Sequence, residues 1–152
     1  MGRTCALHFA SRGACVVITG RNERALGETI GEIVNGAGKA RHLAGDVTNP
    51  ANRAAMVDKA VASFGRLDIV VAAAANGQGA VETFQSARSK MSAGERFIAL
   101  LPAGAAGAAI DREVRALGAD VVAFEGQESS EEGRERAWEA AALAVVSLAA
   151  RA

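Results

Sequence analysis

The sequence contains no tyrosine and is poor in other proton-transfer groups. It has only two histidines and three lysines (Lys39, Lys59 and Lys90). A reaction that uses a tyrosine as acid or base is therefore excluded within this chain. The two cysteines, Cys5 and Cys15, are too few for a disulfide framework and lack the spacing of metal ligands. We expect no metal site, and we predict a cytoplasmic protein.

Net charge and long apolar runs are absent as well. Lys plus Arg and Asp plus Glu each number 17, so no net field draws the chain to nucleic acid or to an anionic membrane. No apolar run approaches the roughly 18 residues of a membrane-spanning helix. The N-terminal stretch MGRTCALHFASRG resembles the cut-in start of a helix more than a signal peptide. We therefore expect neither nucleic acid nor membrane as a partner.

What is present is an alternation of strand-like and helix-like segments. Short apolar runs predict strands over 14–19, 40–45 and 67–74. Between the strands, apolar residues recur at helical spacing, first at Leu26, Ile30, Ile33 and Val34, and then at Val57, Ala60, Val61 and Phe64. This alternation predicts an α/β fold with a mainly parallel sheet covered on both faces, in one domain over 1–152.

The ends of these two helices have recognisable signals. Asn35-Gly-Ala-Gly38 is a helix stop, since glycine adopts the backbone conformation that ends a helix. Asn49 and Pro50 predict the N-cap and the first position of the second helix. These signals delimit both helices without reference to any other protein.

The second half of the chain, 78–152, predicts a further βαβ unit and a C-terminal helix. Residues 78–93 are polar and helix-permissive, with little apolar periodicity. The expected elements that follow are a strand over 97–101, a turn over 102–107, a helix over 108–117 and a strand over 120–124. Ser129 and Glu132 have the spacing of a capping box and predict the start of a final helix. One face of that helix would hold Trp138, Ala142, Val145 and Ala149.

Three segments together resemble the short-chain dehydrogenase/reductase family, a group of NAD(P)-dependent Rossmann enzymes. They are GRTCALHFASRGACVVITGRN, HLAGDVTNP and FGRLDIVV, within residues 2–71. The resemblance implies a Rossmann-like three-layer α/β/α fold over 2–77 in which the first helix precedes the family's second strand. The match begins at the last glycine of the family's phosphate-binding loop, so the expected fold lacks the family's first strand.

The resemblance also implies a cofactor site. Gly2 matches that last loop glycine, where a helix N-terminus faces a pyrophosphate. Arg21 and Asn22 occupy the place where the family distinguishes its two cofactors, and an arginine there suits the 2′-phosphate of NADP(H) better than the ribose of NAD. Asp46 and Val47 match the pair that lines the adenine pocket. Two simpler interpretations stay open, because Arg21 could be a solvated turn residue and Asp46 a turn-forming acid.

The chain departs from the family at its active-site end. The family's Asn-Asn-Ala-Gly after its fourth strand is replaced by Ala72-Ala-Ala-Ala75, which offers no side-chain hydrogen bond. The family's Tyr-x-x-x-Lys pair has no counterpart, so no catalytic residue is assigned. The resemblance implies hydride transfer between a nicotinamide cofactor and a carbonyl or alcohol, and these departures predict that the chain is catalytically incomplete.

The missing strand leaves two further expectations open. In the family that strand lies centrally, so its loss leaves either unpaired strand edges or a gap that another strand fills. Phe97–Leu101, followed by Gly104 and Gly107, could fill the gap and form a second phosphate loop, or it could be an ordinary strand-to-helix connection. The alternative to an enzyme is a non-catalytic nucleotide-binding or interaction subunit. Such a subunit would pair its open sheet edge with a second copy or with another chain.

Overall fold

The fold alternates helices and parallel strands along the chain. The structure is a computed structural model that describes residues 2–73, 79–91, 96–102 and 105–124, together with 132, 135–136, 139–140, 142–144 and 147. Its elements, in order, are α1 (Gly2–Ser11), β1 (Cys15–Gly20), α2 (Glu23–Asn35), β2 (Lys39–Ala44), α3 (Pro50–Phe64), β3 (Ile69–Ala72), α4 (Ala80–Arg88), β4 (Arg96–Pro102), α5 (Ala105–Ala116) and β5 (Asp120–Phe124). The expected α/β Rossmann-like class is confirmed.

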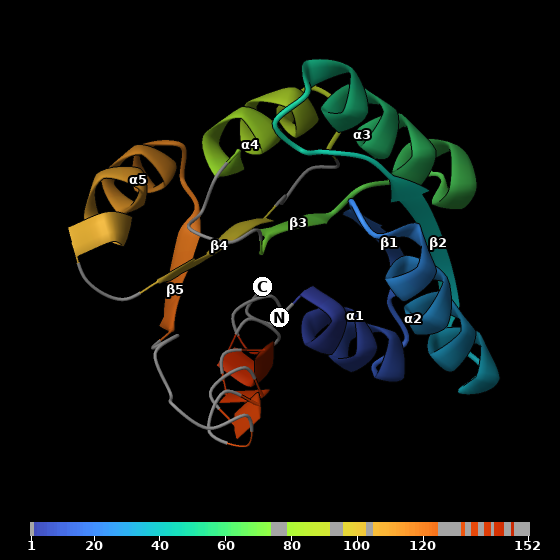
Figure 1. Cartoon of the computed structure of the whole chain (residues 1–152). Coiled ribbons are helices and arrows are strands. Elements are labelled where there is room, and N and C mark those ends of the chain that lie inside the picture. The colour runs from blue at the N-terminus through green and yellow to red at the C-terminus, as the bar shows by residue number, and fades with distance from the viewer. Residues whose placement is uncertain are drawn as a thin grey trace.

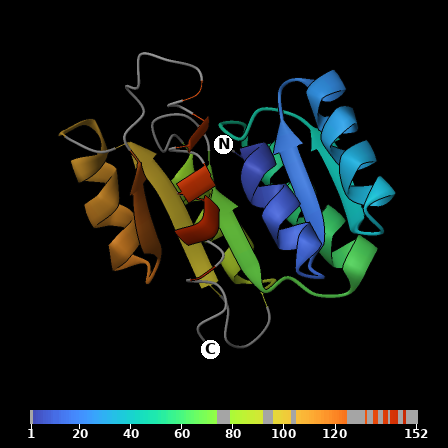
Figure 2. The same ribbon diagram turned by 90° about the horizontal axis from the view of Figure 1, so that it is seen from below.

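The strands form two parallel groups (Figure 1). β1 pairs with β2, from Cys15 opposite Lys39 to Gly20 opposite Ala44. β4 lies between β3 and β5 and pairs in parallel with both. Figure 2 shows all five arrows pointing in the same direction, so the two groups have one common carboxyl edge. Within the described residues no strand joins β1 to β3, which agrees with the first of the two open expectations, unpaired strand edges.

Two helices on opposite faces join the two groups of strands. On one face, Cys5 of α1 belongs to the same buried cluster as Ile98 of β4, and Ala6 of α1 belongs to the same cluster as Ala40 of β2. On the other face, α3 contacts β1 and β2, while its Val57 packs in the same cluster as Val70 of β3. In Figure 1, α3, α4 and α5 cover this second face, and α1 and α2 cover the first. The result is the three-layer arrangement expected from the sequence.

The position of β4 decides between the two interpretations of Phe97–Leu101 that the sequence left open. The segment Phe97–Leu101 forms a strand as predicted, but that strand does not enter the space between β1 and β3. It pairs with β3 because the chain leaves β3, forms α4 on one face and returns directly beside it. The ordinary strand-to-helix connection is therefore the correct interpretation. Gly104 lies outside the described residues, and the predicted turn gives way to α5 from Ala105 onward.

The predicted start of α3 is confirmed in its chemistry, and the predicted end of α2 is confirmed in its position only. Asn49 caps α3, with its side-chain oxygen accepting from the N–H of Ala51 at 2.9 Å, and Pro50 follows it. α3 ends at Phe64 and is capped by Gly65, whose φ of 79° lies in the left-handed region that favours glycine. α2 ends at Asn35, at the start of the predicted stop, but the left-handed residue there is Ala37, with a φ of 63°, and Gly36 has a φ of −83°. One assignment was wrong, because Val34 lies off the buried stripe of α2 and is 52% exposed.

Among the described residues, the largest buried cluster contains the inner face of α4. Phe84 is fully buried, and its ring centroid lies 4.8 Å from that of Phe97 in β4. Ala80 and Ala87 of the same helix are also buried, so the apolar face repeats at helical spacing after all. The sequence hid this periodicity because two of its three members are alanines. No helix in the described part of the chain is long and apolar enough to span a membrane.

Candidate functional site

The carboxyl ends of β1 and β2 meet at one point of the structure. The last residues of the two strands, Gly20 and Ala44, are opposite each other. The N–H of Gly45 then donates to the carbonyl oxygen of Gly20 at 2.9 Å, which extends the pairing by one residue. Arg21 and Asp46 follow directly, so both begin loops at the same edge of the sheet. In open α/β sheets this edge is where ligands bind.

Asp46 organises the loop that follows β2. Its Oδ1 accepts hydrogen bonds from the backbone N–H of Thr48 at 2.9 Å and from the Thr48 hydroxyl at 2.8 Å. These two bonds to Thr48 lower the pKa of the Asp46 carboxyl, and the nearby charge of Arg21 lowers it further. Asp46 thus forms a turn, as the simpler interpretation of the sequence predicted. Among the described residues its second oxygen, Oδ2, has no hydrogen-bond partner and can still accept one.

Arg21 and Asn22 differ in whether their side chains already have partners within the described structure. Asn22 is the N-cap of α2, and its side-chain oxygen accepts from the N–H of Ala25 at 3.1 Å. Arg21 is exposed, and no carboxylate of the described residues forms an ion pair with it. The guanidinium is therefore the available cation at this edge. Its fork of N–H donors matches the oxygens of a phosphate or carboxylate.

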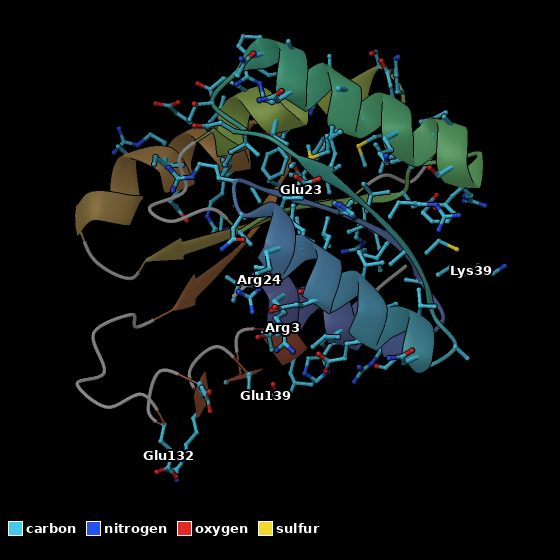
Figure 3. All side chains as sticks on the ribbon, turned by 45° about the vertical axis from the view of Figure 1, so that its right-hand side comes forward. Arg3, Glu23, Arg24, Lys39, Glu132 and Glu139 are labelled. Atoms are coloured by element: carbon cyan, nitrogen blue, oxygen red, sulfur yellow. The ribbon has the colours of Figure 1, made fainter. Side chains whose placement is uncertain are left out.

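Gly2 begins α1 at the same carboxyl edge, on the side of β3. A β-carbon added to Gly2 would lie 3.8 Å from the Cβ of Ala73, the residue that follows β3. The first N–H groups of a helix lack intrahelical partners and favour an anion. The side chain of Arg3 forms an ion pair with Glu32 of α2, and Figure 3 shows Arg3 beside that helix. In the described structure no hydrogen bond or ion pair joins Gly2 to the other four predicted residues.

Two side chains in the first turn of α3 bind the backbone around Val47, and the sequence did not predict either of them. The Arg53 guanidinium Nη1 donates to the carbonyl oxygens of Val47 at 2.8 Å and Thr48 at 3.0 Å. The Asn52 amide donates to the carbonyl oxygen of Asp46 at 3.1 Å. A signal for Arg53 was available, because it lies four residues before Val57 on the apolar face of α3.

The end of β3 is apolar, as the alanine run predicts. Ala72 is the last residue of the strand and Ala73 follows it, while positions 74 and 75 lie outside the described residues. Methyl groups can pack here but cannot hydrogen-bond a substrate. No group of three potential metal ligands occurs among the described side chains. The described part of this edge therefore has the exposed Arg21 and hydrogen-bond acceptors, and its alanines offer no proton donor suited to a carbonyl.

These residues fit a phosphate-containing nucleotide in type and placement. A helix N-terminus and an exposed arginine are donors for phosphate, and the Asp46 carboxylate and the loop around Val47 could border a base or sugar.

Other polar pairs lie elsewhere on the molecule. His8 contacts Glu139 at 2.6 Å, which ties α1 to the C-terminal segment. In Figure 3, Glu139 lies nearer the helices than Glu132 does.

Comparison with known proteins identifies relatives over the first part of the chain. A family model described as enoyl-(acyl carrier protein) reductase matches residues 1–95. A Mycobacterium tuberculosis protein named (5R,7aS)-5-hydroxy-7a-methyl-1-oxo-2,3,5,6,7,7a-hexahydro-1H-indene-carboxyl-CoA reductase is 40% identical over 72 residues. That match covers 47% of this chain and 28% of the relative. The matched segment thus spans little more than a quarter of the length of that curated relative.

Solved structures share the fold over nearly the whole chain. The glucose dehydrogenase of Caenorhabditis elegans, in its apo form, superposes with a TM-score of 0.79 at 22% identity, covering 97% of this chain and 84% of its own. A metagenomic short-chain oxidoreductase in complex with NADP gives a TM-score of 0.69 at 20% identity, covering 99% and 86%. At such identities the likeness establishes the arrangement of strands and helices.

Proposed function

Over residues 1–95 this chain belongs to the short-chain dehydrogenase/reductase family, and from that premise we propose that it contains the NADP(H)-binding part of such an oxidoreductase. The proposal depends mainly on one observation. Arg21 and Asp46 begin adjacent loops at the carboxyl edge, joined by the bond between Gly45 and Gly20. A cation and a hydrogen-bond acceptor are thereby placed side by side where this fold binds ligands.

In this proposal each predicted residue has a distinct role. The N–H groups at Gly2 face the pyrophosphate, and Arg21 binds the 2′-phosphate that distinguishes NADP(H) from NAD(H). Asn22 sets the start of α2 beside that phosphate through its cap. Asp46 and Val47 border the adenine. The NADP complex of one structural neighbour is in keeping with this cofactor class.

Catalysis within the 152 residues is proposed to be incomplete. If bound here, NADPH would supply hydride chemistry toward a carbonyl carbon, and forming the alcohol would also need a proton at the carbonyl oxygen. The sequence has no tyrosine, and methyl groups occupy Ala72 and Ala73 at the end of β3. The chain would therefore bind the cofactor without a tyrosine to protonate the substrate, and the described end of β3 brings no other proton donor. A cytoplasmic location, where nicotinamide cofactors are abundant, remains part of the proposal.

A second candidate function is that of an interaction subunit. It is favoured by the break between β1 and β3, because α1 and α3 contact both groups of strands while no described hydrogen bond joins β1 to β3. Backbone groups along such an inner edge favour a strand partner. The partner would be a second copy of this chain or an extended apolar segment of another protein.

Nucleotide titration tests the first candidate. We expect saturable quenching or enhancement of NADPH fluorescence by the purified protein, and tighter binding of NADPH than of NADH. Arg21→Asp should weaken NADPH binding more than NADH binding, because it removes the cation and adds a charge that repels the 2′-phosphate. Arg112→Asp makes the same charge change at an exposed position of α5 and should leave both affinities unchanged.

Two further results would separate the candidates. A folded protein that binds neither nucleotide at millimolar concentration would refute the cofactor site. Sedimentation equilibrium over a wide concentration range tests the interaction subunit, since self-pairing predicts a dimer. A protein that stays monomeric and captures no strand-forming peptide would count against that second function.

A further inference from the structure

Arg53 is a buried arginine whose position the proposed function does not yet explain. Only 9% of its surface is exposed, and no carboxylate of the described residues forms an ion pair with it. Its Nε is buried without a hydrogen-bond partner in the described structure. Burying a guanidinium in this way is costly, because water hydrates the charge better than two carbonyl oxygens do. A surface position for this residue would avoid the cost.

The carbonyl groups beside Arg53 belong to the loop of the candidate site. Three consecutive carbonyl oxygens of that loop, those of Asp46, Val47 and Thr48, are all bound by side chains from the first turn of α3. Asn52 binds the first, and the single Nη1 atom of Arg53 binds the other two. The direction of these bonds is uniform, with α3 donating and the loop accepting.

The other side of the loop is restrained as well. Gly79, at the start of α4, lies so near the carbonyl of Val47 that an added β-carbon would come within 3.4 Å of its oxygen. Gly79 also has a φ of 75°, which a residue with a side chain rarely adopts. The Val47 carbonyl is therefore enclosed between Arg53 and the backbone of Gly79, and it cannot rotate away without losing a charged donor.

We propose that Arg53 is a positioning residue of the nucleotide site, which fixes the Asp46–Thr48 loop in the shape that borders the adenine. This inference rests on the proposed function. Arg53 would not contact the nucleotide, and it would act through the loop backbone. Since the adenine end is common to NADPH and NADH, Arg53 should affect both cofactors equally, whereas Arg21 should affect mainly NADPH.

The test compares three variants in the full chain, each checked for folding by urea denaturation. Arg53→Met removes the donors and keeps an apolar stem, Arg53→Lys keeps a cation that can reach a carbonyl, and Arg112→Met is the exposed control on α5. Dissociation constants are measured for NADPH and NADH. Hydrogen exchange is followed at the amides of Thr48 and Asn49, which donate within the loop to Asp46.

We expect Arg53→Met to weaken the binding of both nucleotides by roughly tenfold, with an unchanged ratio of the dissociation constants for NADPH and NADH. The Thr48 and Asn49 amides should exchange faster, Arg53→Lys should recover part of both losses, and Arg112→Met should match the wild type. If the wild type binds and Arg53→Met binds equally well, the inference is overturned while the proposed function stands.

A wild type that binds neither nucleotide would refute the proposed function and, with it, any nucleotide role for Arg53. Hydrogen exchange then still reports on the loop by itself. Faster exchange of the Thr48 and Asn49 amides in Arg53→Met would show that Arg53 fixes the loop for structural reasons alone. Unchanged exchange would show that Arg53 does not fix the loop. The experiment thus distinguishes failure of the positioning role of Arg53 from failure of the proposed nucleotide site.

Discussion

Cys5 and Ala6 are neighbours in α1, yet their buried side chains pack on different groups of strands. Cys5 lies in a cluster with Ile98 of β4, and Ala6 lies in a cluster with Ala40 of β2. The two side chains point apart because successive residues of a helix are separated by about 100° around its axis. On this face of the sheet, α1 therefore bridges the break between β1 and β3.

Enlarging Ala6 should disturb this bridge. Ala6 is 4% exposed, and Ala40 of the same buried cluster is 1% exposed, so little space is left around the Ala6 methyl group. We expect Ala6→Leu to lower the free energy of unfolding by about 1–3 kcal/mol, measured by urea denaturation. Ala62→Leu, at an exposed position of α3, should change it by less than about 0.5 kcal/mol. Equal effects in the two variants would contradict this account of α1.

The two cysteines should differ strongly in reactivity. Burial raises the pKa of the Cys5 thiol to about 11, whereas Cys15 is exposed. At pH 8 a thiol reagent should therefore label Cys15 at once and Cys5 only after unfolding, with Cys15→Ser confirming the assignment. Because folding raises the Cys5 pKa above its unfolded value near 9.0, the neutral thiol adds stability below about pH 9, and this contribution is lost between about pH 9 and 11. Rapid labelling of Cys5 in the native protein would refute the packing of α1.

Removing the Phe84 ring should be the most damaging of these core substitutions. The side chain is fully buried and packs on Phe97 with 4.8 Å between ring centroids. Phe84→Ala should cost about 3–5 kcal/mol of unfolding free energy, from lost burial and the cavity left behind. Val34→Ala removes apolar atoms that are already half exposed, so we expect a much smaller change in the same urea titration. A Phe84→Ala loss below about 1 kcal/mol would mean that the α4 core is not formed.

The Asp46 carboxyl should make the protein sensitive to acid. Its folded pKa lies below the ordinary value of about 3.8, chiefly because Thr48 donates two hydrogen bonds to the ionised form. Its stabilising contribution is therefore present above about pH 4 and is lost as the pH falls through the lowered value. Asp46→Asn keeps an acceptor oxygen but does not titrate. In urea denaturation from pH 6 down to 2.5, wild type should lose more stability than Asp46→Asn, and parallel curves would contradict this role.

Asn22 should contribute to stability through its cap, independently of any ligand. Its side-chain oxygen accepts the N–H of Ala25 at the start of α2. Asn22→Ala should lower the unfolding free energy by about 1 kcal/mol, and Asn22→Ser should retain most of the wild-type value because serine also caps. Thermal or urea unfolding without nucleotide provides the measurement. If Asn22→Ser is as unstable as Asn22→Ala, the cap is not the reason.

The sequence predicted those parts of the fold that depend on local chemistry. The strand at Asp120–Phe124 and the start of α3 agree with expectation, because a β-branched run and an Asn-Pro cap act over a few residues. The buried face of α4 was missed because Ala80 and Ala87 resemble surface residues in a hydropathy pattern. The place of β4 beside β3 could not be deduced from local pattern, because strand order depends on how the connections cross the sheet.

The candidate site shows the same division. That Arg21 and Asp46 lie at one edge follows from parallel strands, since their carboxyl ends meet there. The hydrogen bonds from Arg53 to the Val47 and Thr48 carbonyls could not be predicted from the sequence, because an arginine in a helix is ordinarily expected to be solvent-exposed. Its place on the apolar face, four residues before Val57, was the available sign.

The break between β1 and β3 has a consequence for how the chain folds and moves. Every strand pairing in the described structure joins consecutive strands of the sequence, β1 with β2, β3 with β4 and β4 with β5. Such pairings have low contact order, so each half can assemble early from its own neighbours. Between the halves no described backbone hydrogen bond crosses from β1 to β3, so side-chain packing of α1 and α3 and the ion pair between Asp58 and Lys90 are what resist sliding among the described residues. We expect the halves to behave as two foldons, with native-state hydrogen exchange reporting separate opening free energies for each.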